Sequence, residues 1–420
     1  MSAAKPPLRA GSLPFTLLLG ALVTLASFAT DMGLPVLAET GRSLGVTPAT
    51  AALTMSVFMA GFALGPLVFG PVSDRAGRRP VLLAGIAAYT LFGGVGAVAS
   101  SIEMLLVCRL LMGMGAGTVQ VLVLSMVRDL FSGREARAQQ SYVNMAAGLA
   151  PIIAPTLGVA IAALGGWRGI YATLAAGGAL LLTAAALRLP ETAPRRTRAP
   201  LTLRTTAANY RRVLRHPLSA GNALVVALTF SCLFAWVSGS SLVLIGLLGA
   251  TPRTYGLMFA VTSLGLMAGS LTNARLTRRG VPHARLMSVG LAVVTGTALV
   301  LLALAATRTL TTALFVSLLV AGNVAHGVVR PNAAQGALEP MPDIVGVASA
   351  LLSSLQMLMA AGVSALAASL YDGKTAVAMT ATMSVCALAS VLVYAAVVRP
   401  AERRRRHDVP GGVSQSRAAA

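Results

Sequence analysis

The sequence predicts an all-α membrane protein in which twelve transmembrane helices form two pseudo-symmetric six-helix bundles. Of the 420 residues, 56% are hydrophobic and only 11% are charged, whereas a soluble protein needs about 25% charged residues to cover its surface. The apolar residues fall into twelve runs, each long enough to cross a bilayer as a helix. One long polar stretch separates the first six runs from the last six. This composition excludes an ordinary soluble enzyme and a disordered chain.

The first expected span follows Lys5 and Arg9, as a signal peptide would, but it continues past Asp31 without a small-residue cleavage site, so we expect it to remain as a helix. Several runs exceed the minimum length, which indicates tilt or extension beyond the hydrocarbon. The twelve expected spans cover residues 14–37, 50–72, 80–100, 103–126, 138–163, 167–188, 218–248, 254–276, 284–306, 309–329, 343–370 and 373–398.

The positive charges indicate the orientation of the chain, because Lys and Arg collect in loops that stay in the cytoplasm. With the N-terminus inside, the inner segments hold 27 basic residues, including Arg330, and the outer loops hold five, while Arg109 falls within a span. We therefore expect both termini in the cytoplasm. The same asymmetry accounts for the net charge of +21 without a nucleic-acid partner.

The polar stretch also sets the expected domains. These are a cytoplasmic N-terminus (1–13), a first six-helix bundle (14–188), a basic cytoplasmic linker (189–217), a second bundle (218–398) and a basic cytoplasmic tail (399–420). The two bundles have nearly equal lengths, and a short pattern recurs in both. Gly70 is followed by Asp74 and then by arginines, and Gly269 is followed by Asn273 and then by arginines. Such repetition indicates an internal duplication.

The sequence contains no pattern that favours catalysis or metal binding. The three cysteines, Cys108, Cys232 and Cys386, lie far apart in apolar runs, so we expect buried small side chains rather than ligands or disulfides. There is no Walker loop, no His/Cys cluster and no nucleophile elbow. We expect neither a cofactor nor a metal, and no enzymatic activity.

The segment GPVSDRAGRR (70–79) resembles the signature of the major facilitator superfamily. Further segments resemble its drug–proton antiporter branch and, within it, the bicyclomycin and chloramphenicol resistance exporters: ATDMGLPVL (29–37), RLLMGMGAGTVQVLVLSMVRD (109–129), APIIAPTLG (150–158), GWRGIYATL (166–174), LPET (189–192) and PNAAQGALEPMPDIVGVASAL (331–351). The likeness covers nearly all of residues 25–400 in the right order. It implies the major facilitator fold and a monomer in a bacterial inner membrane. The expected function is proton-coupled efflux of small amphipathic drugs; the alternative is transport of an endogenous metabolite.

Asp31 is the expected proton-coupling acid. An ionised carboxylate in a membrane helix costs several kcal/mol, so such a residue faces a cavity and usually serves function. It could bind a proton in one state of the protein and release it in another. The resemblance supports this role, although Val23 stands where some relatives carry a second acid and Gly33 stands where an aromatic residue is common. Proton stoichiometry and substrate range stay open, and the alternative is a location at the outer interface.

Arg109 is the expected partner of Asp31. A guanidinium cannot lose its charge in a protein, so near the start of the fourth span it needs a carboxylate, carbonyl groups or water. The resemblance implies that Arg109 senses the protonation of the acid in the first span, pairing with the ionised form and releasing the protonated one. The alternative is a structural pair with Glu103, less than two helical turns away.

The loop after the second span is expected to act as a conformational latch. Its glycines allow a tight turn and close helix approach, and the charge of Asp74 suits the N-terminus of span 11 near residues 343–345. Arg78 and Asp129 would complete a charge network that closes the inner gate. The expected latch residues are Gly70, Asp74, Arg75, Gly77, Arg78, Arg79 and Asp129.

Pro151, Pro155 and Gly158 interrupt the fifth span. Proline kinks a helix, and glycine permits close packing with a neighbour. The resemblance identifies this segment with a motif that limits leak through the closed interface, in a weakened form because Ala154 precedes Pro155 and Val159 follows Gly158. The alternative is a packing kink with no role in coupling.

Polar, aromatic and methionine side chains within the spans are the candidates for contacts with the drug, since methionine adapts to varied ligands. His326, the only histidine in mid-span, also has a hydrogen-bonded packing role as an alternative. The candidates are Met55, Phe58, Met59, Phe62, Gln120, Asn144, Phe230, Phe234, Trp236, Asn323 and His326.

Overall fold

The structure is a computed structural model that describes residues 8–192 and 203–407, with the side chains at 74, 137, 203–206 and 405–407 left aside. All regular structure in these ranges is helical, which confirms the expected all-α class. The α-helices are α1 (Leu13–Asp31), α2 (Leu37–Ser43), α3 (Pro48–Ala76), α4 (Arg78–Ala97), α5 (Ile102–Leu130), α6 (Gly133–Arg188), α7 (Leu203–Arg215), α8 (Pro217–Ser241), α9 (Pro252–Arg278), α10 (His283–Ala306), α11 (Thr312–Leu338), α12 (Val345–Ser369), α13 (Val377–Val393) and α14 (Arg399–His407), with a 3-10 turn at Leu34–Val36 and π-helical extensions at Leu242–Leu247 and Tyr394–Val398.

Eleven helices of the described ranges are long and apolar enough to cross a membrane. One of them, α6, has 56 residues, and its backbone leaves helical geometry at Gly165 and Gly166. Gly166 has a φ of +59°, which favours glycine because other residues pay a steric cost there. The break divides α6 into the fifth and sixth expected spans, so the twelve predicted spans are all present.

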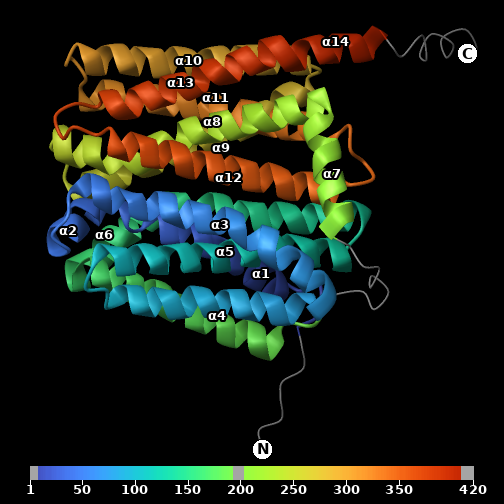
Figure 1. The fold of residues 1–420 in the computed structure, drawn as a ribbon, viewed down its shortest axis with the longest axis horizontal. Helices are drawn as coiled ribbons and strands as arrows, with labels where there is room; N and C mark the ends of the chain where they lie inside the picture. Colours follow the sequence, from blue (N-terminus) through green and yellow to red (C-terminus); the bar gives the residue numbers. More distant parts are fainter. Residues whose placement is uncertain (1–7, 193–202, 408–420) are drawn as a thin grey trace, which may run out of the picture.

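The helices form two bundles that lie against each other. In Figure 1, helices of the first half of the chain occupy the lower layer and helices of the second half the upper layer. Two helix pairs join the bundles, α3 with α12 and α6 with α9. The hydroxyl of Ser354 in α12 donates a hydrogen bond to the carbonyl of Ala63 in α3 at 3.3 Å. We call the end of the molecule that carries α7 and α14 the linker end, and the opposite end the distal end.

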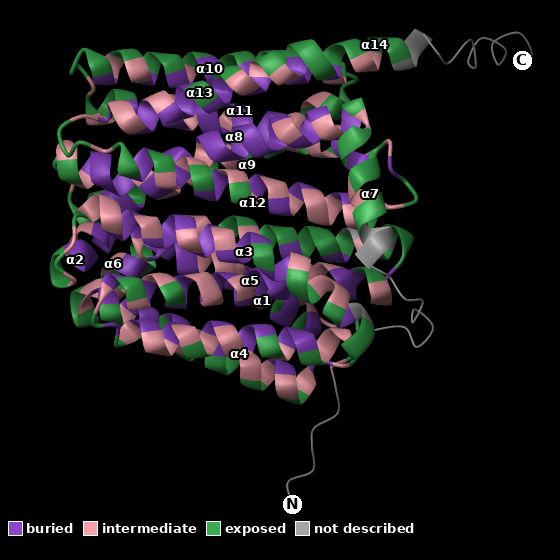
Figure 2. Cartoon of the chain, viewed as in Figure 1, coloured by how far each residue is buried: buried purple, intermediate pink, exposed green. Residues whose placement is uncertain are grey.

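Burial follows the position of each helix in its bundle. In Figure 2, α8 is largely buried, whereas α4 and α10 at the outside expose much of their surface. Large apolar side chains lie on these outer faces, such as Leu91, which is 60% exposed, and Val289, which is 57% exposed. An apolar outer surface is stable against hydrocarbon, where the helices satisfy their own backbone hydrogen bonds.

Glycines set the closest helix contacts, and they do so in the same way in both halves. A Cβ on Gly61 or Gly65 of α3 would collide with the backbone of α5 at Leu110 and Met114. In the second half, a Cβ on Gly269 of α9 would collide with the backbone of α11. Small residues allow such close approach in membrane bundles. The corresponding packing of α3 on α5 and of α9 on α11 agrees with the repeat seen in the sequence.

The first span is interrupted. The prediction made it one helix to residue 37, but within the span Leu13–Ser43 α1 ends at Asp31 and a turn leads into the short helix α2. Pro35 explains the early end. It has no N–H, so the carbonyl of Asp31 would lack its helical partner four residues later, and proline also disfavours helical geometry in the residue before it.

A helix also lies in the segment predicted as the linker. Within residues 189–217, α7 lies across the linker end of the bundles (Figure 1). Its Val213 is buried against Met341 and Ala348 of the second half. Its apolar residues recur on one face of a helix, a signal that the basic composition of the stretch concealed, and the contact with α12 stabilises it.

Candidate functional site

Asp31 is enclosed by protein. It is the last residue of α1 and is only 5% exposed. The helix ends at this residue for the reason given above, so the carboxylate lies at a break in the span rather than in the middle of a continuous helix. The carboxylate thus faces protein rather than bulk water or lipid. Whether Asp31 lies at the outer interface, the alternative considered from the sequence, is not tested by its burial.

Arg109 of α5 caps the end of α1. Its Nη1 donates a hydrogen bond to the carbonyl of Ala29 at 2.8 Å, and its Nε donates to the carbonyl of Thr54 at 3.1 Å. The last carbonyls of a helix lack intrahelical donors, and a cation suits the negative end of the helix dipole. Arg109 is 2% exposed, so it holds α1 from the inside, two residues before Asp31.

Asp31 and Arg109 lie near each other without forming a bond. Their charges are close enough to interact electrostatically, but no hydrogen bond or ion pair joins these two described side chains. Glu103 is exposed at the start of α5, and it does not pair with Arg109 either. Of the alternatives left open for Arg109, carbonyl groups are the acceptors in this structure.

Aromatic and methionine side chains surround the guanidinium. The carbon Cζ of Arg109 lies 4.3 Å from the centre of the Phe58 ring and 6.0 Å from that of Tyr171, which are distances at which a cation is attracted to a ring. The sulfur of Met55 lies 3.7 Å from Nη2. Thus Met55 and Phe58, which were predicted as drug contacts, lie against the guanidinium of Arg109.

A small cavity opens beside this arginine. Within this cavity, the space available to the centre of a water molecule is about 20 Å³, which is enough for one water. Polar atoms face it from Thr30, Thr54 and Arg109. Its lining comprises Ala29, Thr30, Gly33, Val36, Leu37, Thr40, Thr54, Met55, Arg109, Trp167, Ile170, Tyr171 and Leu174. Thr30 and Gly33, on either side of Asp31, thus line a space that can hold a water molecule.

The fifth span packs against the turn that follows Asp31. A Cβ on Gly158 would collide with the carbonyl of Met32, so only glycine fits there. Two residues earlier, Thr156 faces the second bundle: a Cβ on Gly256 of α9 would lie 3.2 Å from its hydroxyl oxygen. The segment that contains Pro155 therefore contacts both the Asp31 turn and the other bundle. Its role in coupling stays a prediction.

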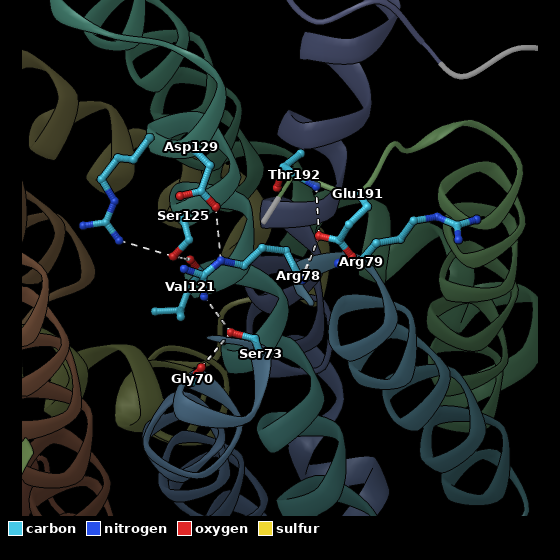
Figure 3. A network of polar contacts seen from close by, with 10 residues as sticks. Gly70, Ser73, Arg78, Arg79, Val121, Ser125, Asp129, Glu191 and Thr192 are labelled. Atoms are coloured by element: carbon cyan, nitrogen blue, oxygen red, sulfur yellow. Dashed lines mark hydrogen bonds and ion pairs between the residues drawn. The ribbon is translucent and has the colours of Figure 1, made fainter. Parts of the chain in front are cut away.

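The loop after α3 carries a polar network (Figure 3). Arg78 donates from Nε to Asp129 at 3.1 Å and from Nη1 to the hydroxyl of Ser73 at 2.7 Å. The carboxylate of Glu191 accepts the backbone N–H groups of Arg78 and Arg79 at 3.0 and 3.1 Å. The predicted Arg78–Asp129 contact is thus present, within the first bundle.

Two members of this network were missed from the sequence. Ser73 stands inside the signature segment and Glu191 inside LPET (189–192), so the same two segments held the signal. Glu191 satisfies N–H groups at the start of α4 that no helical partner reaches. The role of the network as a latch is not tested by these contacts.

The other predicted latch residues differ in their surroundings. Gly77 has a φ of +101° and makes the turn between α3 and α4, as predicted. A Cβ on Gly70 would meet nothing within 4 Å, so the expected close helix approach at that glycine is wrong. Arg75 is exposed, and the side chain of Asp74 lies outside the described part. Near the network, the side chain of Arg128 lies beside Gly346 at the start of α12.

The remaining predicted drug contacts are spread over both bundles. Met59, Phe62 and Trp236 are buried in apolar clusters, Trp236 with its ring centre 5.2 Å from that of Phe259. Asn144 is exposed and Gln120 is partly buried. The structure does not gather these residues into one described cavity, and their contact with a drug stays a prediction.

The polar candidates of the second bundle form internal hydrogen bonds. Asn323 donates to the carbonyl of Thr262 at 2.9 Å. The ring nitrogens of His326 lie 2.8 and 3.0 Å from the carbonyl oxygens of Gly322 and Thr229. The packing role kept as an alternative for His326 therefore has direct support.

One charged residue was misplaced from the sequence. Arg330 was assigned to a cytoplasmic loop, but it lies inside α11, eight residues before that helix ends. The expected span ended at residue 329, just before Arg330 and Pro331. In the structure the helix continues through the proline.

Comparisons with known proteins agree with this architecture. The family model of the Major Facilitator Superfamily matches residues 17–364. A bicyclomycin resistance protein homolog of Haemophilus influenzae is 30% identical over 381 residues, covering 90% of this chain and 95% of that protein. A chloramphenicol resistance protein of Pseudomonas aeruginosa is 38% identical over 178 residues, covering 42% of each chain.

The fold also matches solved transporters. A bacterial homologue of the human lysosomal transporter Spinster, in an inward-facing and unoccupied conformation, superposes with a TM-score of 0.73 at 16% identity, covering 96% of this chain and all of that chain. Proteins of this family are transporters, which confirms that the chain is not an enzyme. The chain belongs to the Major Facilitator Superfamily, as a multi-pass membrane protein related to its bicyclomycin and chloramphenicol resistance branch.

Proposed function

We propose that this protein exports small amphipathic drugs from a bacterial cytoplasm in exchange for protons. Relatives named for bicyclomycin and chloramphenicol resistance support the substrate class. The observation that carries the proton-coupling part is the buried Asp31, which lies two residues after the helix carbonyl that Arg109 holds. An acid in that position can gain or lose a proton and thereby change how α1 is held, without any other acid in the contact.

In the proposed cycle, the two bundles rock around a central site and alternately open it to each side. Protonation of Asp31 from outside weakens its attraction to Arg109 and lets the drug leave. The protein then opens inward, the proton departs and the ionised carboxylate draws Arg109 toward it. The contacts of Arg109 with α1 and α3 are the ones that this movement would change.

The proposal includes an orientation and a gate. The linker end, which carries α7 and α14, faces the cytoplasm of a bacterial inner membrane, as the distribution of Lys and Arg indicates. The network of Arg78, Asp129 and Glu191 then lies at the inner side, where it would stabilise the closed inner gate. The protein works as a monomer, because each chain contributes both bundles.

The test is Asp31→Asn, which keeps the size of the side chain and removes its titration. In everted vesicles with an imposed pH gradient, we expect this variant to lose gradient-driven uptake of chloramphenicol by at least tenfold. Exchange of labelled for unlabelled chloramphenicol without a gradient should remain. Asp372→Asn is the control, since that exposed aspartate lies in a distal turn where it accepts N–H groups of its own loop.

Full gradient-driven transport by Asp31→Asn would reject the coupling role of the acid. Absence of chloramphenicol exchange in the wild-type protein would reject the substrate class instead. A drug-susceptibility panel in cells that express either variant separates a drug exporter from a transporter of an endogenous metabolite, since only the former changes resistance.

A further inference from the structure

Arg330 is a second arginine within the membrane-spanning part of the protein. It lies in α11 about 12 Å from the end of that helix, from the rise of roughly 1.5 Å per residue. Its guanidinium stays charged under all physiological conditions. A permanent charge at such a depth is costly, and intramembrane cations generally face a partner or a functional cavity.

Among the residues that the structure describes, Arg330 has no such charged or hydrogen-bonding partner. No hydrogen bond or ion pair links its guanidinium to any residue of the described ranges, and no charged group lies close enough to interact with it favourably. Arg109 offers the contrast, since it donates to two carbonyl oxygens. The side chain of Arg330 is only partly buried, so part of its surface is free to meet another molecule.

The guanidinium of Arg330 points toward the interior of the bundle. Its Cζ lies 4.9 Å from the centre of the Phe230 ring, a cation–π distance. A ring nitrogen of His326 lies against the carbonyl oxygen of Thr229, so His326 of α11 and Thr229 of α8 lie at the same level along the bundle. Arg330 lies one turn nearer the linker end, whereas Phe230 lies on the distal side of Thr229. The side chain thus reaches toward mid-span, opposite to an arginine that extends to the membrane surface.

Aromatic rings continue from this arginine toward the first bundle. The ring centres of Phe230 and Phe234 lie 4.6 Å apart, and Phe234 packs against the apolar core of the first bundle. The two ring planes are tilted by 37° to each other. A flat ring system could pack against these rings while a group attached to it meets the guanidinium.

The neighbouring polar group cannot serve as the acceptor. His326, one turn before Arg330, has both ring nitrogens placed against the carbonyl oxygens of Gly322 and Thr229. Both nitrogens face these carbonyl oxygens, so neither accepts a hydrogen bond from Arg330. Among the described residues Arg330 therefore lacks an acceptor, which a bound molecule would supply.

We propose that Arg330 binds an anionic group, such as a carboxylate, on an aromatic compound that this protein transports, with Phe230 and Phe234 stacking on its ring. The inference rests on the proposed export function and names the substrate class. A guanidinium binds a carboxylate through two parallel hydrogen bonds, which a neutral amide cannot match. The protein should therefore prefer an aromatic acid to its amide.

The test compares dansylglycine with dansylglycinamide, two fluorescent compounds that differ only in the carboxylate. Their binding to the full-length protein in detergent is followed by fluorescence. We expect the wild-type protein to bind the acid at least tenfold more tightly than the amide. Arg330→Gln should abolish this preference, and Arg330→Lys should keep part of it, since lysine retains the charge but not the fork geometry. Arg253→Gln, at an exposed distal position, is the control.

Equal affinity of the wild-type protein for the acid and the amide would overturn the proposal, as would an unchanged preference in Arg330→Gln. Melting temperatures show whether each variant is folded, and Phe230→Leu gives a second test, because loss of stacking should weaken both compounds about equally.

Transport in everted vesicles separates this inference from the proposed function. If Asp31→Asn retains gradient-driven transport while Arg330→Gln selectively loses the acid, proton coupling through Asp31 fails and the binding role stands. If Asp31→Asn is inactive and Arg330→Gln treats both compounds as the wild-type protein does, the binding role fails and the coupling stands.

Discussion

At the scale of single residues, the main finding is how Arg109 is held. It donates to a carbonyl of α1 and to a carbonyl of α3, so one side chain links the helix that ends in Asp31 to its neighbour. Such a link needs two donors in fixed directions, which the guanidinium provides. A change in the charge of Asp31 acts next to this link.

Arg109→Lys tests that geometry. An ammonium lacks the fixed fork of donors that bonds the carbonyls of Ala29 and Thr54, so we expect at least a tenfold lower initial rate of gradient-driven transport in everted vesicles. Arg168→Lys is the matched control, because Arg168 also donates to a carbonyl, that of Ala99, and covers a tryptophan ring, but it is exposed at the distal end. A wild-type rate for Arg109→Lys would contradict the role of the double contact.

Gly158→Ala tests the contact between the fifth span and the Asp31 turn. The added methyl group would overlap the carbonyl of Met32, and overpacking of this kind costs about 1–3 kcal/mol. We expect a lower melting temperature in detergent and weaker transport. Gly148→Ala, in the same helix with nothing within 4 Å of the added carbon, should be neutral or slightly stabilising. The same melting temperature for both variants would show that the turn after Asp31 accommodates the methyl group without loss of stability.

At the scale of elements, composition and periodic apolar runs were enough to predict the spans. The breaks within and between these spans were harder to predict from the sequence. Pro35 explains the end of α1 only once the missing partner of Asp31 is considered. The tenth span was expected to end at residue 329, although α11 continues through Pro331. The amphipathic pattern of α7 was a local signal for a helix, but its docking depends on residues more than 100 positions away, such as Met341. Spans follow from local chemistry, whereas breaks and docked helices depend on tertiary packing.

Glu191→Gln tests the cap of α4. Its carboxylate accepts the N–H groups of Arg78 and Arg79, and the negative charge also suits the positive end of the helix dipole. Loss of a cap costs about 1 kcal/mol, so we expect a lower melting temperature at neutral pH. Glu135→Gln, at an exposed position in the first turn of α6, should change stability less. Equal effects of the two variants would mean that the Glu191 contact adds nothing specific.

The docking of α7 should depend on pH. Arg212 of α7 donates to Asp343 in the loop between α11 and α12, and this contact holds the pKa of that aspartate below its usual value. A lowered pKa in the folded protein means that the contact stabilises at neutral pH and is lost as the pH falls below the usual range of aspartate. The melting-temperature difference between the wild-type protein and Asp343→Asn should be small at pH 7, since the pair is exposed, and absent at pH 3. A difference that grows on acidification would contradict the ion pair.

At the scale of the whole molecule, the candidate residues are divided between the two bundles. Asp31 and Arg109 both belong to the first bundle, and Arg330 with its aromatic neighbours belongs to the second. The sequence identified the first two because a lone acid and a lone arginine in apolar runs are conspicuous. It could not show that Arg330 lies unpaired beside Phe230, since that depends on how α11 packs on α8. A transported compound held by Arg330 would thus be released or retained according to the position of the bundles.

Relative motion of the bundles can be tested with a reversible covalent link. Thr156 of α6 and Gly256 of α9 face each other across the bundles, and a Cβ on the glycine would lie 3.4 Å from the Cα of Thr156, close enough for a disulfide. In a protein whose three native cysteines are replaced by alanine, Thr156→Cys with Gly256→Cys should stop transport on oxidation and regain it on reduction. The control pair, Gly93→Cys with Ala175→Cys, joins α4 and α6 inside the first bundle, where a Cβ on the glycine would lie 3.4 Å from that of Ala175. Oxidation of the control should leave the rate within about twofold, because a rigid bundle loses no motion when it is linked internally. Transport that continued in the oxidised Thr156–Gly256 variant, with the link confirmed by mass spectrometry, would mean that this part of the interface stays closed throughout the cycle.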